Sequence, residues 1–300
     1  MIDLHVHILP GLDDGPGDWE TSVEMCRIAA DDGIRTLVAT PHFHEGLFEP
    51  DRQLIADRAR ELADRIADVC RIEILIGADV RIGPNLPAKI RDGVVPTLND
   101  SGYLLLELPD GAPLPELQRI VFDLMVHGVR PVLTHPERNP QFQGREERLR
   151  PLVDAGVLVQ LSAMSVCGGF GRAARRAAHR MLRLGLTHCL ASDAHSRVRR
   201  PPRLSGAVAE AGRLIGPGAA RRLVVENPDR ILRGEEPAAP RPTREDRGPG
   251  LLTRLARRSV PFLSPHERKV ERPDPERAPH AEHAGGVPEE RRDRGGGGGA

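Results

Sequence analysis

The chain has 300 residues, 39% of them hydrophobic, which is enough for one large globular domain or two small ones. Lys and Arg together number 43, as do Asp and Glu, so the net charge is zero and long-range charge favours neither a nucleic acid nor a membrane surface as partner. No apolar run approaches the ~20 residues of a membrane span, and Asp3 and His5 stand where a secretory signal would be basic or apolar. We therefore expect a cytoplasmic protein with no direct membrane insertion.

The four cysteines form no Cys-x-x-Cys pair; they are Cys26, Cys70, Cys167 and Cys189. We interpret them as small buried apolar side chains in a reducing compartment. Cysteine phosphatases use Cys-x5-Arg, in which a loop wraps the phosphate and the Arg clamps it. Cys167 is followed by Arg172, one residue short of that spacing, so the sequence argues against thiol chemistry.

Short β-type runs alternate with longer amphipathic stretches before Gly234. The predicted strands are Ile2–Val6, Thr36–Ala39, Ile72–Ile76, Tyr103–Leu108, Arg130–Thr134, Val157–Leu161 and Cys189–Ala191. The predicted helices are Asp18–Asp31, Asp51–Val69, Leu114–Val126, Glu146–Ala155, Ala173–Leu184 and Arg203–Leu214, with Asp18 as an N-cap and Gly33, Gly128, Gly156 and Gly185 as helix ends. Seven strands joined mostly by helices predict an α/β fold with a parallel sheet, and their number favours a closed barrel.

The composition changes near Gly234. Residues 235–300 are rich in Pro, Gly, Arg and Glu, and such a sequence buries too little apolar surface to offset the entropy of ordering. We therefore predict one domain over residues 1–234 and a disordered tail over residues 235–300.

Histidines and acids gather where the predicted strands end, and in a βα barrel all these ends face one mouth. They are His5 and His7, then Asp14 in the following loop, His42, Asp79, Glu107, His135, Asp193 and His195. His-x-His on a strand directs both imidazoles to one face, because side chains alternate with period two. Five imidazoles with carboxylates exceed the needs of one ion, so we expect two or three. Mixed N and O ligands suit Mn, Fe, Co or Zn better than Ca or Mg.

The other histidines of the domain receive a structural interpretation: hydrogen-bonded side chains at His44, His127, His179 and His188. Two arginines share loops with the predicted ligands, since Arg138 follows His135 by three residues and Arg200 follows Asp193 by seven. A guanidinium forks onto two phosphate oxygens. We expect the nearby Arg197, Arg199 and Arg203 to be solvated surface charges.

These motifs resemble those of the polymerase and histidinol phosphatase (PHP) superfamily: His5-Val6-His7, Thr40-Pro41-His42 and Ser192-Asp193-Ala194-His195. Residues 1–16, MIDLHVHILPGLDDGP, resemble the start of one branch, the bacterial PHP-type protein-tyrosine phosphatases of capsular and extracellular polysaccharide synthesis. Further agreement comes from PTLNDS at residues 96–101, HPER at 135–138, GFG at 169–171, RPP at 200–202 and NP at 227–228. The resemblance covers residues 1–233.

The resemblance implies a distorted seven-stranded βα barrel, up to three metal ions (usually manganese) and hydrolysis of phosphotyrosine on a protein, typically a membrane-associated tyrosine kinase. It makes ligands of His5, His7, Asp14, His42, Glu107, His135, Asp193 and His195, and phosphate contacts of Arg138 and Arg200. The family usually has Glu in the position of Asp79, so this shorter acid must approach more closely or bind through water. Some members carry two basic residues where Phe43 and His44 stand here, so any phosphate contact of that pair is lost.

The leading hypothesis is therefore hydrolysis of a phosphotyrosine monoester, in which two cations activate a bridging water for in-line attack. A second hypothesis keeps the fold and changes the substrate to a small alkyl phosphate such as histidinol phosphate; the Asp13-Asp14-Gly15-Pro16 segment argues against it. A third is a binding or scaffold protein that has lost its activity and works through residues 235–300. The nearly intact ligand set argues against that.

Overall fold

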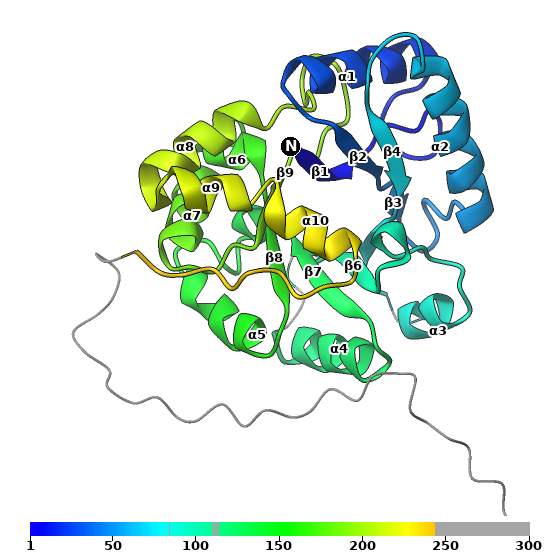
Figure 1. Ribbon diagram of the computed structural model, residues 1–300. Coiled ribbons are helices and arrows are strands. Elements are labelled where there is room, and N and C mark those ends of the chain that lie inside the picture. Colours follow the sequence, from blue (N-terminus) through cyan, green and yellow to red (C-terminus); the bar gives the residue numbers. More distant parts are fainter. Residues whose placement is uncertain (84, 110, 112–113, 244–300) are drawn as a thin grey trace, which may run out of the picture. The chain divides into compact units, whose positions relative to one another are not determined.

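Strands and helices alternate through the described part of the chain, which in this computed structural model is residues 1–243 without residues 84, 110, 112 and 113 (Figure 1). The strands are β1 (Ile2–Val6), β2 (Thr36–Ala39), β3 (His42–Phe43), β4 (Glu73–Ile76), β5 (Asp79–Arg81), β6 (Tyr103–Glu107), β7 (Arg130–Thr134), β8 (Leu158–Ser162) and β9 (Cys189–Ala191). The α-helices are α1 (Trp19–Asp31), α2 (Arg52–Ile66), α3 (Leu86–Arg91), α4 (Leu114–Val126), α5 (Arg150–Asp154), α6 (Ala163–Cys167), α7 (Gly171–Arg183), α8 (Ser205–Ile215), α9 (Pro217–Arg222) and α10 (Glu226–Leu232). Three short 3-10 helices are η1 (Leu98–Asp100), η2 (Pro136–Arg138) and η3 (Glu146–Leu149).

Each of the seven predicted β runs overlaps an observed strand, and the structure adds the short strands β3 and β5. The six predicted helices are also present, with Glu146–Ala155 divided into η3 and α5. The Asp18 carboxylate accepts a hydrogen bond from the Thr21 backbone N–H, as expected of an N-cap. Among the helices of the described residues, none is both long and apolar enough to cross a membrane.

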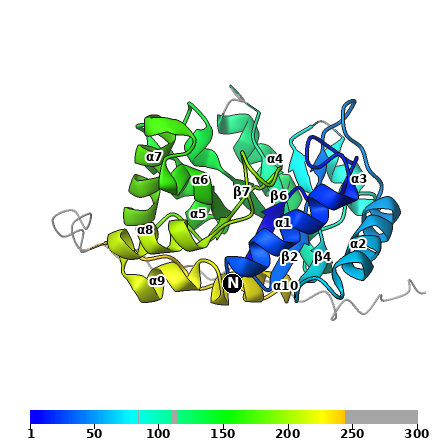
Figure 2. The ribbon, with the colours of Figure 1, turned by 90° about the horizontal axis from the view of Figure 1, so that it is seen from above.

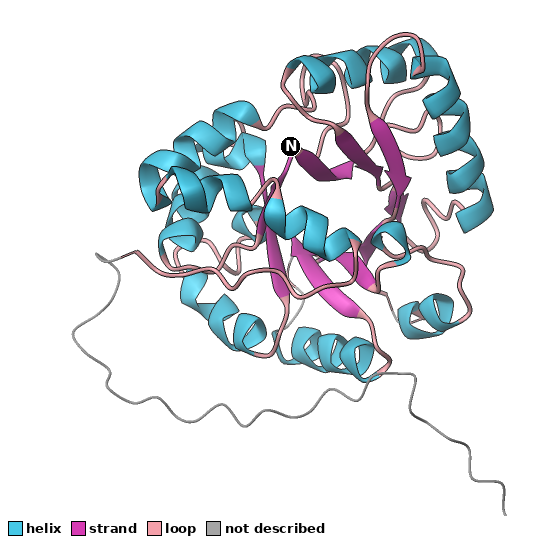
Figure 3. Cartoon of the chain, viewed as in Figure 1, coloured by secondary structure: helices cyan, strands magenta, loops and turns pink. Residues whose placement is uncertain are grey.

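The strands pair in parallel and close into a ring (Figure 3). The hydrogen-bonded orders are β1-β2-β4 and β3-β5-β6-β7-β8-β9. Strand β3 continues the line of β2, and β5 that of β4, each after a break of two residues. At these breaks the Gly77 N–H donates to the Ala39 carbonyl, which carries the hydrogen bonding from one sheet to the other. The ring closes between β1 and the end of β9, where Val6 bridges Ala194 and the Asp193 N–H donates to the His5 carbonyl at 2.9 Å. The expected closed α/β barrel is therefore present.

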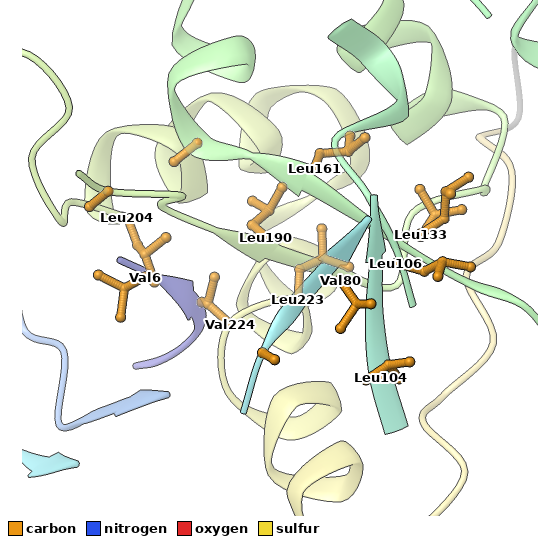
Figure 4. Close-up of a cluster of buried hydrophobic side chains, with 14 of the residues drawn as sticks. Val6, Val80, Leu104, Leu106, Leu133, Leu161, Leu190, Leu204, Leu223 and Val224 are labelled. Atoms are coloured by element: carbon orange, nitrogen blue, oxygen red, sulfur yellow. The ribbon is translucent and has the colours of Figure 1, made fainter. Parts of the chain in front are cut away.

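Two apolar clusters lie on opposite sides of the strands. Along β6, Leu104 and Leu106 belong to the large outer cluster between strands and helices, whereas Tyr103 and Leu105 belong to a smaller inner cluster. Figure 4 shows part of the outer cluster. This period of two is that of a strand with both faces buried. Burying one such Leu side chain stabilises the fold by about 1.5–3 kcal/mol.

The end of the barrel at which the strands begin is covered by the last described segment. Figures 1 and 2 place the N-terminus, α9 and α10 together at this end. Residues 235–243 follow α10 along the barrel: the Tyr103 hydroxyl donates to the Glu235 carbonyl at 3.0 Å, the Asn227 side chain pairs with both backbone groups of Ala238, and the Thr243 N–H donates to the Arg183 carbonyl.

The sequence had placed residues 235–243 in the disordered tail, and for these nine residues that prediction is wrong. Backbone groups supply most of the contacts, so side-chain composition carried no signal of them. The rest of the predicted tail, residues 244–300, lies outside the described residues.

We predict that deleting residues 235–300 lowers the melting temperature relative to deleting residues 244–300. The longer deletion removes the acceptor of the Tyr103 hydroxyl and the Ala238 N–H that donates to the buried Asn227 Oδ1, while Asn227 Nδ2 keeps its bond to the His188 carbonyl. Leaving buried polar groups without partners costs about 1–3 kcal/mol each, and about 2 kcal/mol corresponds to roughly 4–8 °C in a domain of this size. Differential scanning calorimetry of the two deletions measures the difference. Equal melting temperatures would show that residues 235–243 contribute nothing.

Candidate metal and phosphate site

A one-residue bulge in β1 directs two histidines into the barrel. Ile2 pairs with Thr36 and Asp3 with Leu37, but Val6 pairs with Ala39, so β1 uses one residue more than β2 over this interval. A shift of one residue exchanges the faces of a strand. Leu4 therefore lies in the inner cluster while Val6 lies in the outer one. His5 and His7, both fully buried, share the face opposite Val6.

The buried Asp3 carboxylate supports this bulge. Its Oδ1 accepts hydrogen bonds from the His5 N–H at 3.3 Å and from the Ser192 N–H at 3.0 Å. Burial raises the pKa of Asp3 to about 6. Asp3 thereby ties β1 to the loop after β9, and both segments carry predicted ligands. The sequence prediction missed this role, although an acid within an apolar strand was a usable signal.

The five predicted histidine ligands converge at the mouth where the strands end. His5 Nε2 and His7 Nε2 are 3.0 Å apart, and the His7 ring centroid lies 3.8 Å from that of His195 and 4.3 Å from that of His42. The His135 ring lies 5.9 Å from that of His5. Burial, with the neighbouring imidazoles, holds the pKa of His7 well below its usual value, and burial lowers the pKa of His135 to about 4. Neutral imidazoles keep the lone pairs that a metal needs.

Two acids face the imidazoles of His42 and His195. Asp14 Oδ1 lies 3.2 Å from His195 Nε2 and 3.5 Å from His42 Nε2, and the contact with His195 lowers the pKa of Asp14 to about 2. Asp79 Oδ2 lies 3.2 Å from His42 Nδ1 and 3.6 Å from His5 Nε2. Burial acts against ionisation of Asp79, but electrostatic attraction to the nearby imidazoles of His5 and His42 holds its pKa below the usual value.

Glu107 and His44 form a further contact at the edge of the site. His44 Nε2 lies 2.9 Å from Glu107 Oε2, and the His44 ring lies 4.6 Å from that of His42. The sequence prediction gave His44 a structural hydrogen bond, which it makes, but to a predicted ligand. The signal for a larger role was present, because His42-Phe43-His44 repeats the His-x-His spacing of β1.

Three groups of side chains place their donor atoms close enough to share an ion. Within each group these atoms lie within 4.8 Å of one another; the groups are His7 with Asp14, His42 and His195; His5 with His7 and Asp193; and His42 with His44 and Glu107. Asp79 Oδ1 and Oδ2, His42 Nδ1 and His195 Nε2 are buried without hydrogen-bond partners. Buried polar atoms are costly unless something satisfies them. Divalent ions fit these residues because the unsatisfied atoms are nitrogen and oxygen donors.

Asp193 joins these groups to the two arginines. Its Oδ1 faces the imidazoles, 3.6 Å from His5 Nε2 and 3.7 Å from His7 Nε2. Its Oδ2 accepts hydrogen bonds from Arg138 at 2.7 Å and pairs with Arg200 at 2.6 Å. Asp193 and His135 both have positive φ, 53° and 34°. Such backbone costs about 1–3 kcal/mol at a residue other than glycine and gathers at functional sites.

Three further polar side chains lie around the site, and two of them contact predicted ligands. Asp13 Oδ2 lies 2.6 Å from His7 Nδ1 and accepts the His42 N–H, and Gln160 Oε1 lies 3.0 Å from His5 Nδ1. Such partners fix the ring orientation of a ligating histidine. Glu137 is fully buried, its Oε1 accepts the Ser162 N–H, and burial raises its pKa to about 7. The sequence prediction assigned none of the three, since the distances to their partners depend on the fold.

The structure thus brings together all eleven residues predicted for the site. A family model for capsular polysaccharide synthesis, CpsB/CapC, matches residues 1–233. The chain belongs to the CpsB/CapC family. This confirms the resemblance inferred from the sequence.

Named relatives of the CpsB/CapC chain are phosphatases. It is 35% identical over 197 residues to the tyrosine-protein phosphatase YwqE of Bacillus subtilis, covering 65% of this chain and 78% of YwqE. It is 31% identical over 240 residues to the tyrosine-protein phosphatase CpsB of Streptococcus pneumoniae, covering 77% and 98%. A crystal structure from work on YwqE and CpsB as metal-dependent tyrosine phosphatases matches with a TM-score of 0.76 and 32% identity, over 81% of this chain and 99% of that chain.

We predict that Asp79→Asn weakens manganese binding by about tenfold or more, equivalent to ~1.4 kcal/mol. The amide keeps the shape of the carboxylate but removes its charge and one strong donor oxygen. Asp57→Asn removes a charge from an exposed site on α2 and serves as the control. Manganese titration of chelator-stripped proteins by calorimetry compares them. Wild-type affinity in Asp79→Asn would show that Asp79 is not a ligand.

Proposed function

We propose that this CpsB/CapC protein is a metal-dependent protein-tyrosine phosphatase. The observation that carries the proposal is the position of Asp193, which directs one oxygen to the imidazoles and the other to Arg138 and Arg200. Cation-binding groups and two guanidinium groups around one carboxylate form a receptor for a phosphoryl group. The names of YwqE and CpsB support phosphotyrosine as the substrate.

The metal centre in this proposal holds two or three divalent ions, with manganese as the ion of choice and iron, cobalt or zinc as alternatives. Its ligands are His5, His7, Asp14, His42, Asp79, Glu107, His135, Asp193 and His195. When bound, the ions supply Lewis acidity and lower the pKa of water, so that a nucleophile exists at neutral pH. Asp13 and Gln160 hold the His7 and His5 rings in place for ligation.

The arginines bind and orient the substrate. Arg138 and Arg200 are about one third and one quarter exposed, so both face the mouth while remaining anchored to Asp193. Their forked donors neutralise charge on the phosphoryl oxygens as the phosphorus is attacked. The leaving group is a phenol with a pKa near ~10. It therefore needs less protonation than an alkyl alcohol, and no general acid is assigned.

The physiological substrate in this proposal is a membrane-associated tyrosine kinase of capsule or exopolysaccharide synthesis. The family description supports the link to capsule synthesis. The phosphatase acts from the cytoplasm. Its four cysteines are free thiols, as a reducing compartment maintains them.

A phosphotyrosyl peptide and histidinol phosphate, each with and without manganese after chelation, test the proposal. We expect the wild-type protein to hydrolyse the peptide only with metal, and to prefer it to the alkyl phosphate by at least about tenfold. His7→Ala should lose metal and turnover with an unchanged circular dichroism spectrum, because His7 contacts other polar groups of the site. Preference for histidinol phosphate, or full activity of His7→Ala, would refute the proposal.

Arg138→Lys separates phosphate binding from metal binding. The change keeps the positive charge but loses the two parallel N–H donors of the guanidinium. We therefore expect kcat/KM to fall by about tenfold or more, equivalent to ~1.4 kcal/mol. Metal content should stay at the wild-type level, since guanidinium is not a ligand. Arg213→Lys, on the exposed face of α8, is the matched control. Steady-state kinetics beside metal analysis of the same preparations decides, and normal kinetics or lost metal in Arg138→Lys would contradict the assigned role.

A further inference from the structure

One aromatic ring contacts both site arginines. Phe170 lies in the turn between α6 and α7, half-buried, in a chain with 3% aromatic residues. The guanidinium carbon of Arg138 lies 4.5 Å from the Phe170 ring centroid, and that of Arg200 lies 5.6 Å from it. Both distances are within the range of cation–π attraction. Three separate loops therefore meet at this ring.

The turn that carries Phe170 is built by glycines. Gly168 and Gly171 have φ of 93° and 90°, which other residues rarely adopt. A Cβ on Gly169 would lie 2.8 Å from the Met164 side chain. The positive φ at Gly168 and Gly171 therefore favours glycine on both sides of Phe170, in the turn that presents the ring.

The two arginines need such a fixed surface. Both bind the same oxygen of Asp193, at 2.7 and 2.6 Å, so two like charges are held close together and repel each other. Long side chains lose much rotamer freedom when they are held in one geometry. The Asp193 carboxylate attracts each guanidinium at one edge, and the electron-rich face of Phe170 attracts both without consuming a hydrogen-bond donor. Arg200 Nε is buried without an acceptor, so this side of the guanidinium is not held by a hydrogen bond.

We propose that Phe170 is a positioning residue that holds Arg138 and Arg200 as one preorganised anion-binding pair. The inference rests on the proposed function for the role of the two arginines in phosphate binding. Preorganisation lowers the ordering cost paid at binding, so the ring strengthens phosphate binding through the arginines and not by touching the substrate.

The test compares Phe170→Leu with Phe170→Tyr and with the control Phe122→Leu, which removes an exposed ring on α4. Calorimetry with inorganic phosphate on the manganese-loaded full chain measures anion affinity without turnover. We expect Phe170→Leu to weaken phosphate binding by about fivefold or more and to lower kcat/KM for a phosphotyrosyl peptide. Phe170→Tyr, which retains the ring, should restore both values. Metal content and melting temperature should stay at wild-type levels in all three variants.

A double-mutant cycle shows whether the ring acts through the arginines. In the Arg138→Gln, Arg200→Gln background the loss caused by Phe170→Leu should shrink to less than about twofold, because the cationic groups that it positions are gone. An equal loss in both backgrounds would overturn the inference. So would wild-type phosphate affinity in Phe170→Leu, or a defect confined to aryl substrates, which would indicate direct stacking. If the wild-type protein did not hydrolyse the peptide, the proposed function would be refuted. The calorimetric comparison would still test the role of Phe170, because it measures phosphate binding without turnover.

Discussion

The bulge in β1 is the constraint on which the site depends. Side chains alternate along a strand, so a regular β1 would keep His5 and His7 on the same face as Asp3, opposite Leu4. The extra residue between Asp3 and Val6 lets Leu4 fill the inner cluster while the two histidines still enter the barrel. One strand thereby contributes both to the packed core and to the polar mouth above it. The Asp3 carboxylate stabilises the irregular backbone by accepting the His5 N–H.

The same few residues link distant parts of the chain around that bulge. Asp3 binds the Ser192 N–H, and the Asp193 N–H donates to the His5 carbonyl, so the first strand and the loop after β9 are held in register. Asp193 then divides its two oxygens between the imidazoles and the arginines. A displacement of this loop would therefore disturb ligands and phosphate contacts together. The positive φ of Asp193 is maintained because hydrogen bonds on both sides of the residue determine its position.

The sequence was sufficient to predict the barrel and the clustering of the predicted site residues at one mouth, because both depend on local pattern. Apolar runs of period two mark the strands, and parallel strands place their ends at one mouth whatever the loops between them do. The bulge, the supporting contacts of Asp13 and Gln160, and the packing of residues 235–243 could not be predicted in this way. Each depends on distances between segments far apart in the chain, such as the 155 residues that separate His5 from Gln160. For His44 the sequence showed the His-x-His spacing with His42, but it did not predict the contact with Glu107.

Strand register places the short side chain of Asp79 beside two of the predicted ligands. The resemblance drawn from the sequence implies a Glu at this position, so an Asp that served as a ligand here would need a backbone closer to the ion. Strand β5 begins at Asp79 and pairs it directly with His42 of β3, so the carboxylate starts from the backbone nearest its imidazole partner. Gly77, two residues earlier, lies in the break between β4 and β5, where an added Cβ would lie 2.8 Å from the end of the Leu98 side chain and 3.4 Å from its Cα. The chain is therefore closely packed at this break. Both oxygens of the Asp79 carboxylate are buried without a hydrogen-bond donor. A bound cation would satisfy them and offset the cost of burying the charge.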